Sequence, residues 1–189
     1  MTPALVRRRL AARDTGRVAQ AMPAGRIAAA VLIALVARER AMTAVFTRRT
    51  DHLADHPGQV SFPGGRVEPG DANPVATALR EAGEEIGLAA ARVEVVGCLD
   101  LCDTSTGFAV TPVVGLVAPP LDLTLDTFEV AEVFEVPLDF LLDPANRRRE
   151  QRRYRGRLRD YYVLDYDGRT IWGATARMVV DLSAALGRP

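Results

Sequence analysis

The chain has 189 residues, 24 basic and 24 acidic side chains, and a hydrophobic fraction of 48%. These values are typical of one soluble globular domain, and they exclude collagen-like, intrinsically disordered and disulfide-scaffold proteins. The charges are unevenly distributed, because residues 1–50 carry +8, residues 51–146 carry −14 and residues 147–189 carry +6. This layout suits a cation site with anion-binding walls. Solvated charges, with arginine replacing every lysine through codon bias, are the alternative explanation.

The chain shows no sign of a membrane span or of an oxidising compartment. Cys98 and Cys102 have no second cysteine pair, which favours buried thiols in a reducing compartment and leaves too few ligands for a zinc site. The longest apolar run, residues 27–37, has 11 residues, about half of what a membrane helix needs. Many arginines precede this run, so a buried strand is favoured over a signal peptide. We expect a cytoplasmic protein that binds no membrane.

In chain order, residues 1–24 are expected to form an N-terminal arm or short helix, followed by a single domain over residues 25–189. Alternating strand and turn signals predict a mixed sheet, and a segment rich in glycine and proline at 50–70 predicts a loop. Asp167-Gly168 predicts a hairpin turn. Mixed strands with few helices favour a layered α/β fold. The predicted strands are 27–37, 43–47, 93–101, 108–118, 130–136, 161–166 and 169–172, and the helices are 73–87, 137–142 and 176–186.

The helix between Asn73-Pro74 and Gly87 carries the most informative pattern. Its start has a capping residue followed by proline, and its end has a glycine. One face is apolar, and the other carries three carboxylates that repel one another. These carboxylates lie near the C-terminal end of the helix, where the helix dipole disfavours negative charge. A divalent cation would relieve this repulsion, and Mg²⁺ accepts carboxylates together with water and phosphates. A solvated acidic face is the alternative for these three residues, Glu81, Glu84 and Glu85.

Two neighbouring features favour a metal site over a solvated face. Gly64 and Gly65 form a turn whose backbone can approach a ligand or offer a carbonyl oxygen to a metal ion. Arg80 directly precedes Glu81 and is expected to brace the carboxylates through charge-assisted hydrogen bonds.

These residues resemble the Nudix box of the Nudix hydrolases, in which a glycine and an acid precede Arg-Glu-apolar-x-Glu-Glu-x-Gly-apolar. The glycine is Gly65, the acid is Asp71, and residues 80–88 read Arg-Glu-Ala-Gly-Glu-Glu-Ile-Gly-Leu. Asp71 replaces the glutamate of the general pattern, and eight residues separate it from Arg80. Both departures also characterise the coenzyme A pyrophosphatase branch. The resemblance implies the Nudix α/β/α sandwich with a mixed sheet.

Residues 45–65 are similar to a second motif of that branch, with a departure at Ala54, where the branch has arginine. The resemblance implies hydrolysis of coenzyme A or acyl-coenzyme A to 3′,5′-ADP and 4′-phosphopantetheine or its acyl derivative. Ala54 keeps open another substrate, such as ADP-ribose, a dinucleotide or a nucleoside triphosphate. A catalytically silent nucleotide-binding regulator is the third alternative. The matching residues are Thr47, Arg49, Leu53, His56, Gly58 and Phe62-Pro63-Gly64-Gly65.

The resemblance also implies a role for each candidate residue. Glu81, Glu84 and Glu85, with the Gly65 carbonyl, are implied to hold Mg²⁺ or Mn²⁺, next to Arg80. A general base is needed, and the resemblance implies either a glutamate of the box or a later acid. Glu129 and Glu132 are the candidates for a later acid, with exposed strand residues as the alternative. The candidate substrate-binding residues are Arg49, His56, Gly64 and Gly65, and His56 alternatively organises its loop.

The partner implied is a small nucleotide substrate, and a homodimer is an expectation from the family. Residues 147–159 contain eight arginines. We interpret this stretch as a solvated basic loop, with anion contact near the site as the alternative and no nucleic-acid partner expected.

Overall fold

The computed structural model describes residues 1–11, 23–53, 56–154 and 156–187. Its centre is an eight-stranded sheet around β1 (Ile27–Ala37). β1 pairs in parallel with β7 (Phe108–Val117) and antiparallel with β2 (Met42–Arg49) and β4 (Gly64–Arg66). The mixed sheet that the sequence predicts is therefore confirmed.

The other strands of this sheet extend it at both edges. The main strand order is β3-β2-β1-β7-β5, while β6 pairs with β7 and β8 pairs with β2. The strand predicted over residues 93–101 ends earlier, and the chain pairs again with β7 only at Cys102. These strands are β3 (Val60–Ser61), β5 (Val93–Cys98), β6 (Cys102–Asp103) and β8 (Val130–Pro137).

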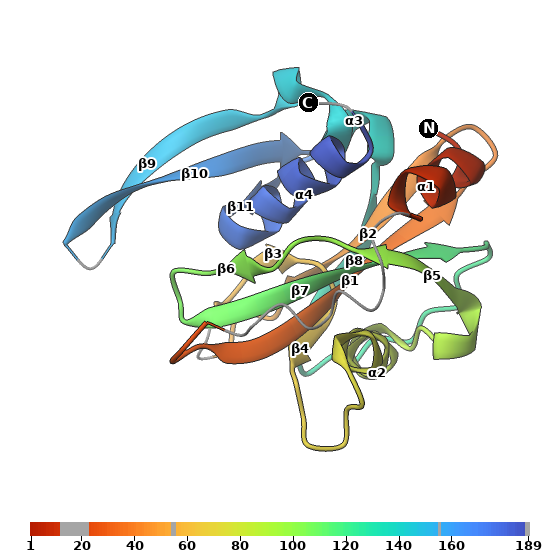
Figure 1. Cartoon of the computed structure of the whole chain (residues 1–189), viewed down its shortest axis with the longest axis horizontal. Helices are drawn as coiled ribbons and strands as arrows, with labels where there is room; N and C mark the ends of the chain where they lie inside the picture. The colour runs from red at the N-terminus through yellow and green to blue at the C-terminus, as the bar shows by residue number, and fades with distance from the viewer. Residues whose placement is uncertain (12–22, 54–55, 155, 188–189) are drawn as a thin grey trace.

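Helices cover both faces of the sheet (Figure 1). α2 (Pro74–Ile86) packs on one face, whereas α1 (Pro3–Leu10), α3 (Leu138–Leu142) and α4 (Gly173–Ala185) lie on the other. Because side chains of a strand alternate between faces, Ile33 joins the core under α4 and Leu32 joins the core under α2. The α/β/α sandwich is thus confirmed. No helix among the described residues is long and apolar enough to cross a lipid bilayer.

The first residues of the chain pack against this sandwich. Of the predicted arm or short helix, Pro3–Leu10 is helical, and Val6 and Leu10 are fully buried in the core. Arg7 donates two hydrogen bonds to Glu94 on β5, at 2.7 and 2.6 Å. Residues 12–22 lie outside the described residues, so the boundary at residues 24 and 25 stays a prediction.

The prediction of a basic loop over residues 147–159 is wrong. This stretch forms β9 (Arg148–Tyr154) and the start of β10 (Arg157–Tyr166), which pair with β11 (Arg169–Trp172) in a second, antiparallel sheet. The β9–β10 end extends away from the sandwich (Figure 1). Arg148 and Arg149 have an acidic and a tyrosine partner on β10, Asp165 and Tyr162, and Glu150 accepts a hydrogen bond from Tyr161. Arg152 lies directly opposite Arg159, so cross-strand partners offset only part of the clustered positive charge.

The predicted loop over residues 50–70 contains two short strands, because β3 pairs with β2 and β4 pairs with β1. β10 begins at Arg157, earlier than the predicted strand over residues 161–166, and the remaining elements lie close to their predicted positions. The Asp167-Gly168 turn has positive φ at both residues, 48° and 74°, as a primed hairpin turn requires. Among the described residues, η2 (Ala90–Arg92) and η3 (Pro144–Asn146) are short 3₁₀ helices.

Candidate active site

Helix α2 is fixed at both ends in the way its sequence predicts. The Asn73 side chain accepts a hydrogen bond from the Ala76 backbone N–H at 3.0 Å. Gly87 ends the helix in the left-handed conformation, with φ of 68°. Ala82 and Ile86 are fully buried against the sheet. The other side of the helix therefore presents the three glutamates next to the Gly64-Gly65 turn.

Glu85 is buried beside the Gly64 backbone. Its side chain accepts a hydrogen bond from the Gly64 N–H at 3.1 Å, and only 7% of the residue is exposed. The pKa of the Glu85 carboxyl is raised to about 8, chiefly by burial and also by the neighbouring charges of Glu81 and Glu129. The Gly64 N–H and the Arg49 guanidinium oppose this shift. Glu85 is thus a carboxylate held in a site where negative charge accumulates.

Glu81 lies directly against Gly65. A Cβ atom built on Gly65 would lie 2.3 Å from Glu81 Oε1 and 2.6 Å from Glu81 Oε2. Burial raises the pKa of Glu81, and the adjacent Arg80 opposes that effect. Glycine at position 65 is therefore a steric requirement for this carboxylate position.

Arg80 holds several acids in one network. It donates two hydrogen bonds to the Asp71 carboxylate, from Nε and Nη2, each at 3.0 Å. Its Nη1 atom lies 2.8 Å from Glu84 Oε2 and 3.0 Å from Glu81 Oε1. The Arg80 guanidinium holds the pKa of Asp71 well below its usual range, with help from the Glu68 N–H and the Thr77 hydroxyl. Asp71 is thus a site residue to which the sequence interpretation gave no role, although its spacing from Arg80 was the signal.

The donor atoms at this site suit a hard divalent cation. Carboxylate oxygens are the ligands that Mg²⁺ and Mn²⁺ prefer, and Glu81 and Glu85 are crowded and partly desolvated. Within the described residues, no three His, Cys, Asp or Glu side chains are arranged closely enough to hold a metal ion together. Glu84 instead pairs with Arg80, and its side chain is 60% exposed. A cation site here therefore needs Glu84 to turn from Arg80 towards the other two glutamates.

The structure separates the two candidate bases. The charge of Glu129 acts on both Glu81 and Glu85 and raises the pKa of each. Glu132 and Val133 are neighbours on β8, so their side chains point to opposite faces of the sheet. Val133 packs against the core under α2. Glu132 therefore faces the opposite side, where Arg48 and Arg169 bind it and lower its pKa.

Arg49 lies at the end of β2, close enough to Glu85 for its charge to act on that carboxyl. Its Nε atom is buried and has no hydrogen-bond partner within the described part of the chain. A buried guanidinium N–H without a partner is costly, so this atom is well placed to donate to a bound anion.

His56 occupies a different environment from Arg49. It is exposed, has a left-handed backbone with φ of 57°, and accepts a hydrogen bond from the Gln59 N–H through its carbonyl. These observations describe a turn residue and leave a substrate contact untested. Ala54, which departs from the branch pattern, lies outside the described residues.

The raised pKa of Glu85 predicts a pH dependence of stability in chelator-treated protein. Its folded-state pKa of about 8 exceeds the ordinary value of 4.5, so between these values the folded state binds more protons than the unfolded state. The free energy of unfolding should therefore fall as pH rises through this window, by at most about 1.4 kcal/mol per pH unit. Urea titrations between pH 5 and pH 8 measure this slope. Glu85→Gln should flatten it, and an equal slope in the variant would contradict the assignment.

Comparisons with known proteins agree with this architecture. Residues 25–155 match the family model described as NUDIX domain. The chain is 42% identical to the "Uncharacterized Nudix hydrolase NudL" of Enterobacter sp. (strain 638), over 84% of this chain and 82% of that protein. It is also 42% identical to the protein of the same name from Yersinia enterocolitica, over 80% of this chain and 77% of that protein.

Solved structures show the same fold. A Nudix hydrolase from M. smegmatis, RenU, superimposes with a TM-score of 0.52 at 24% identity, over 61% of this chain and 73% of that one. The C. elegans Ap4A hydrolase superimposes with a TM-score of 0.51 at 19% identity, over 59% of this chain and 80% of that one. The chain belongs to the Nudix hydrolase family, whose members are pyrophosphohydrolases that generally use divalent cations such as Mg²⁺ or Mn²⁺.

Proposed function

We propose that this protein hydrolyses the diphosphate of coenzyme A or an acyl-coenzyme A to 3′,5′-ADP and 4′-phosphopantetheine or its acyl derivative. The observation that carries the proposal is the pair of crowded carboxylates, Glu81 and Glu85, held against Gly64 and Gly65 with the Arg49 guanidinium alongside. A diphosphate oxygen would accept the hydrogen bond for which Arg49 Nε has no acceptor among the described residues. A divalent cation offsets the repulsion that the carboxylates and the diphosphate create together.

The proposed cation is Mg²⁺ or Mn²⁺, held by Glu81, Glu84, Glu85 and the Gly65 carbonyl. When bound, it supplies charge neutralisation at the diphosphate and acidifies water. Arg80 positions Glu81 and Glu84 through the network that Asp71 anchors. Arg49 Nε donates a hydrogen bond to a phosphate oxygen.

Glu129 is the proposed general base, because its charge acts on the two crowded carboxylates, whereas Glu132 is paired with two arginines. A water oxygen attacks one phosphorus, the bond from that phosphorus to the bridging oxygen breaks, and the other phosphate leaves. Glu129 accepts one proton of the attacking water. Positioning and electrostatics do most of the catalysis in such a transfer.

Coenzyme A is favoured over other diphosphates by the likeness of residues 45–65 to the coenzyme A pyrophosphatase branch. Arg49 is the residue of that segment whose environment adds support, since its buried Nε atom faces no protein acceptor among the described residues. The runner-up is the same reaction on ADP-ribose, a dinucleotide or a nucleoside triphosphate. A cytoplasmic location and a homodimer are further parts of the proposal.

A substrate panel tests the proposal. Coenzyme A, acetyl-coenzyme A, ADP-ribose and diadenosine tetraphosphate are each incubated with the protein and Mg²⁺ or Mn²⁺, and the products are separated by chromatography. We expect 3′,5′-ADP from coenzyme A or its thioester and slower turnover of the others. Turnover of another substrate without 3′,5′-ADP would establish the runner-up. The absence of any turnover, with nucleotide binding retained, would establish the regulator instead.

A further inference from the structure

Phe128 is an exposed aromatic side chain with an aromatic neighbour. The residue is 65% exposed, and its ring centroid lies 4.9 Å from that of His52, with 59° between the two ring planes. His52 is itself exposed. Single apolar side chains on a surface need no explanation. An exposed ring with an aromatic neighbour, however, can stack with a flat ligand.

The turn that carries Phe128 is attached to the helix of the carboxylates. The Asp126 N–H donates to the Glu85 carbonyl, and the Thr124 N–H donates to the Ile86 carbonyl, each at 3.0 Å. The Asp126 side chain accepts the Phe128 N–H at 2.9 Å. Phe128 is therefore two residues from the contact with Glu85 and directly precedes Glu129.

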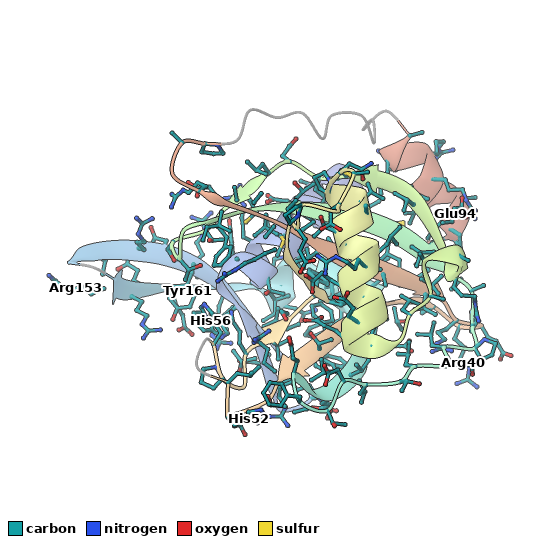
Figure 2. The ribbon with its side chains drawn as sticks, turned by 90° about the horizontal axis from the view of Figure 1, so that it is seen from below. Arg40, His52, His56, Glu94, Arg153 and Tyr161 are labelled. Carbon is teal, nitrogen blue, oxygen red and sulfur yellow. The ribbon has the colours of Figure 1, made fainter. Side chains whose placement is uncertain are left out.

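The segment that carries His52 is attached to the same turn. The Thr50 hydroxyl donates to the Phe128 carbonyl at 2.8 Å, and the Thr50 N–H donates to the Glu129 carbonyl at 3.0 Å. Arg49 directly precedes Thr50, so one short segment carries both the guanidinium and the histidine ring. Figure 2 looks onto the face that α2 covers and shows His52 at the rim of that face. The two rings thus form an edge of the carboxylate site.

We propose that Phe128 and His52 form the nucleobase subsite of this enzyme. The base of the substrate stacks on the Phe128 ring, with the His52 ring at its side, while Arg49 binds a phosphate of the same molecule. This inference rests on the proposed function, because it assigns one end of a nucleoside diphosphate substrate. A flat aromatic base matches an exposed ring, whereas a flexible aliphatic and amide chain has no such face.

Binding of AMP and of ribose 5-phosphate, measured by calorimetry, tests the subsite without turnover. Base stacking on an aromatic side chain contributes about 1–3 kcal/mol, so Phe128→Ala should weaken AMP binding by roughly 5- to 150-fold. Ribose 5-phosphate lacks the base, and its affinity should not change. Phe128→Trp should retain AMP binding, and the stacked adenine should quench the emission of the new indole.

Leu158→Ala is the matched control, because Leu158 is 61% exposed and pairs with Arg153 on the hairpin. Figure 2 shows Arg153 far from His52. This variant should bind AMP as the unmodified protein does. Equal AMP affinity in the Phe128→Ala variant, or an equal loss for ribose 5-phosphate, would overturn the nucleobase subsite. Thermal melting checks that the Phe128→Ala variant stays folded.

Turnover separates this inference from the proposed function. If the protein hydrolyses coenzyme A, Phe128→Ala should raise KM by the same factor as it weakens AMP binding and leave kcat within about twofold. Unchanged KM would refute the subsite alone. If no diphosphate is hydrolysed but AMP binding still depends on Phe128, the proposed function fails and the subsite stands.

Discussion

Replacing Glu85 with glutamine is expected to lower kcat by at least about a hundredfold while the fold is preserved. The change removes a carboxylate from the proposed cation site, and electrostatic stabilisation of this kind contributes several kcal/mol to catalysis. The amide oxygen can still accept the Gly64 N–H, which the carboxylate accepts at 3.1 Å. Steady-state kinetics with coenzyme A and Mg²⁺ or Mn²⁺ measure the effect.

A matched control separates loss of this carboxylate from a general loss of negative charge. Glu94→Gln removes an acid on β5 whose partner is Arg7, outside the candidate site, and should leave kcat unchanged. Thermal melting adds a readout that does not depend on turnover. Mn²⁺ should raise the melting temperature of the unmodified protein and of Glu94→Gln, but much less that of Glu85→Gln. Near-normal kcat in Glu85→Gln would refute the assignment of Glu85 to the cation site.

Gly65→Ala is expected to reduce activity by about a hundredfold or more in a folded protein. The new methyl group would lie 2.3 Å from Glu81 Oε1, so the Glu81 side chain has to move out of its place beside the turn. That side chain is flexible, so the movement costs little stability, whereas the carboxylate cluster loses one member. Kinetics combined with the Mn²⁺ melting shift measure both consequences. Normal activity would show that the position of Glu81 beside Gly65 is dispensable.

Gly64→Ala is the informative comparison, because alanine at position 64 would clash with backbone atoms, whereas alanine at position 65 would clash with a side chain. A Cβ atom there would lie 2.3 Å from the Ala30 carbonyl oxygen, and the Gly64 backbone has φ of 154°. Backbone atoms of a central strand cannot move aside as a side chain can. This change should lower the free energy of unfolding by about 3 kcal/mol. Urea titration of both variants should therefore find a stability loss at position 64 and little at position 65.

Local signals in the sequence were sufficient for the helix that carries the glutamates. Asn73, Pro74 and Gly87 fix its ends, and the apolar spacing fixes its buried face, so α2 and the side that presents the glutamates could be predicted. The place of Asp71 could not, because its two hydrogen bonds to Arg80 depend on the path of the loop before the helix.

The choice between the two candidate bases and the structure of residues 147–159 depend on contacts between segments that are distant in the sequence. Glu129 and Glu132 are equivalent as sequence candidates, but Arg48 and Arg169 bind Glu132, whereas the charge of Glu129 acts on Glu81 and Glu85. Likewise, the arginines of residues 147–159 resemble a loop until their partners on β10 are known. Pairing across strands, rather than composition, determines the structure of that stretch.

The Arg80 network bears on how this protein matures. Its guanidinium already occupies the midst of Asp71, Glu81 and Glu84, and so provides the positive charge that these acids need while the chain folds. If a cation binds as proposed, the chain is therefore expected to fold without it. Metal supply would then govern how active the enzyme is, and would add to the stability of a fold that forms in its absence.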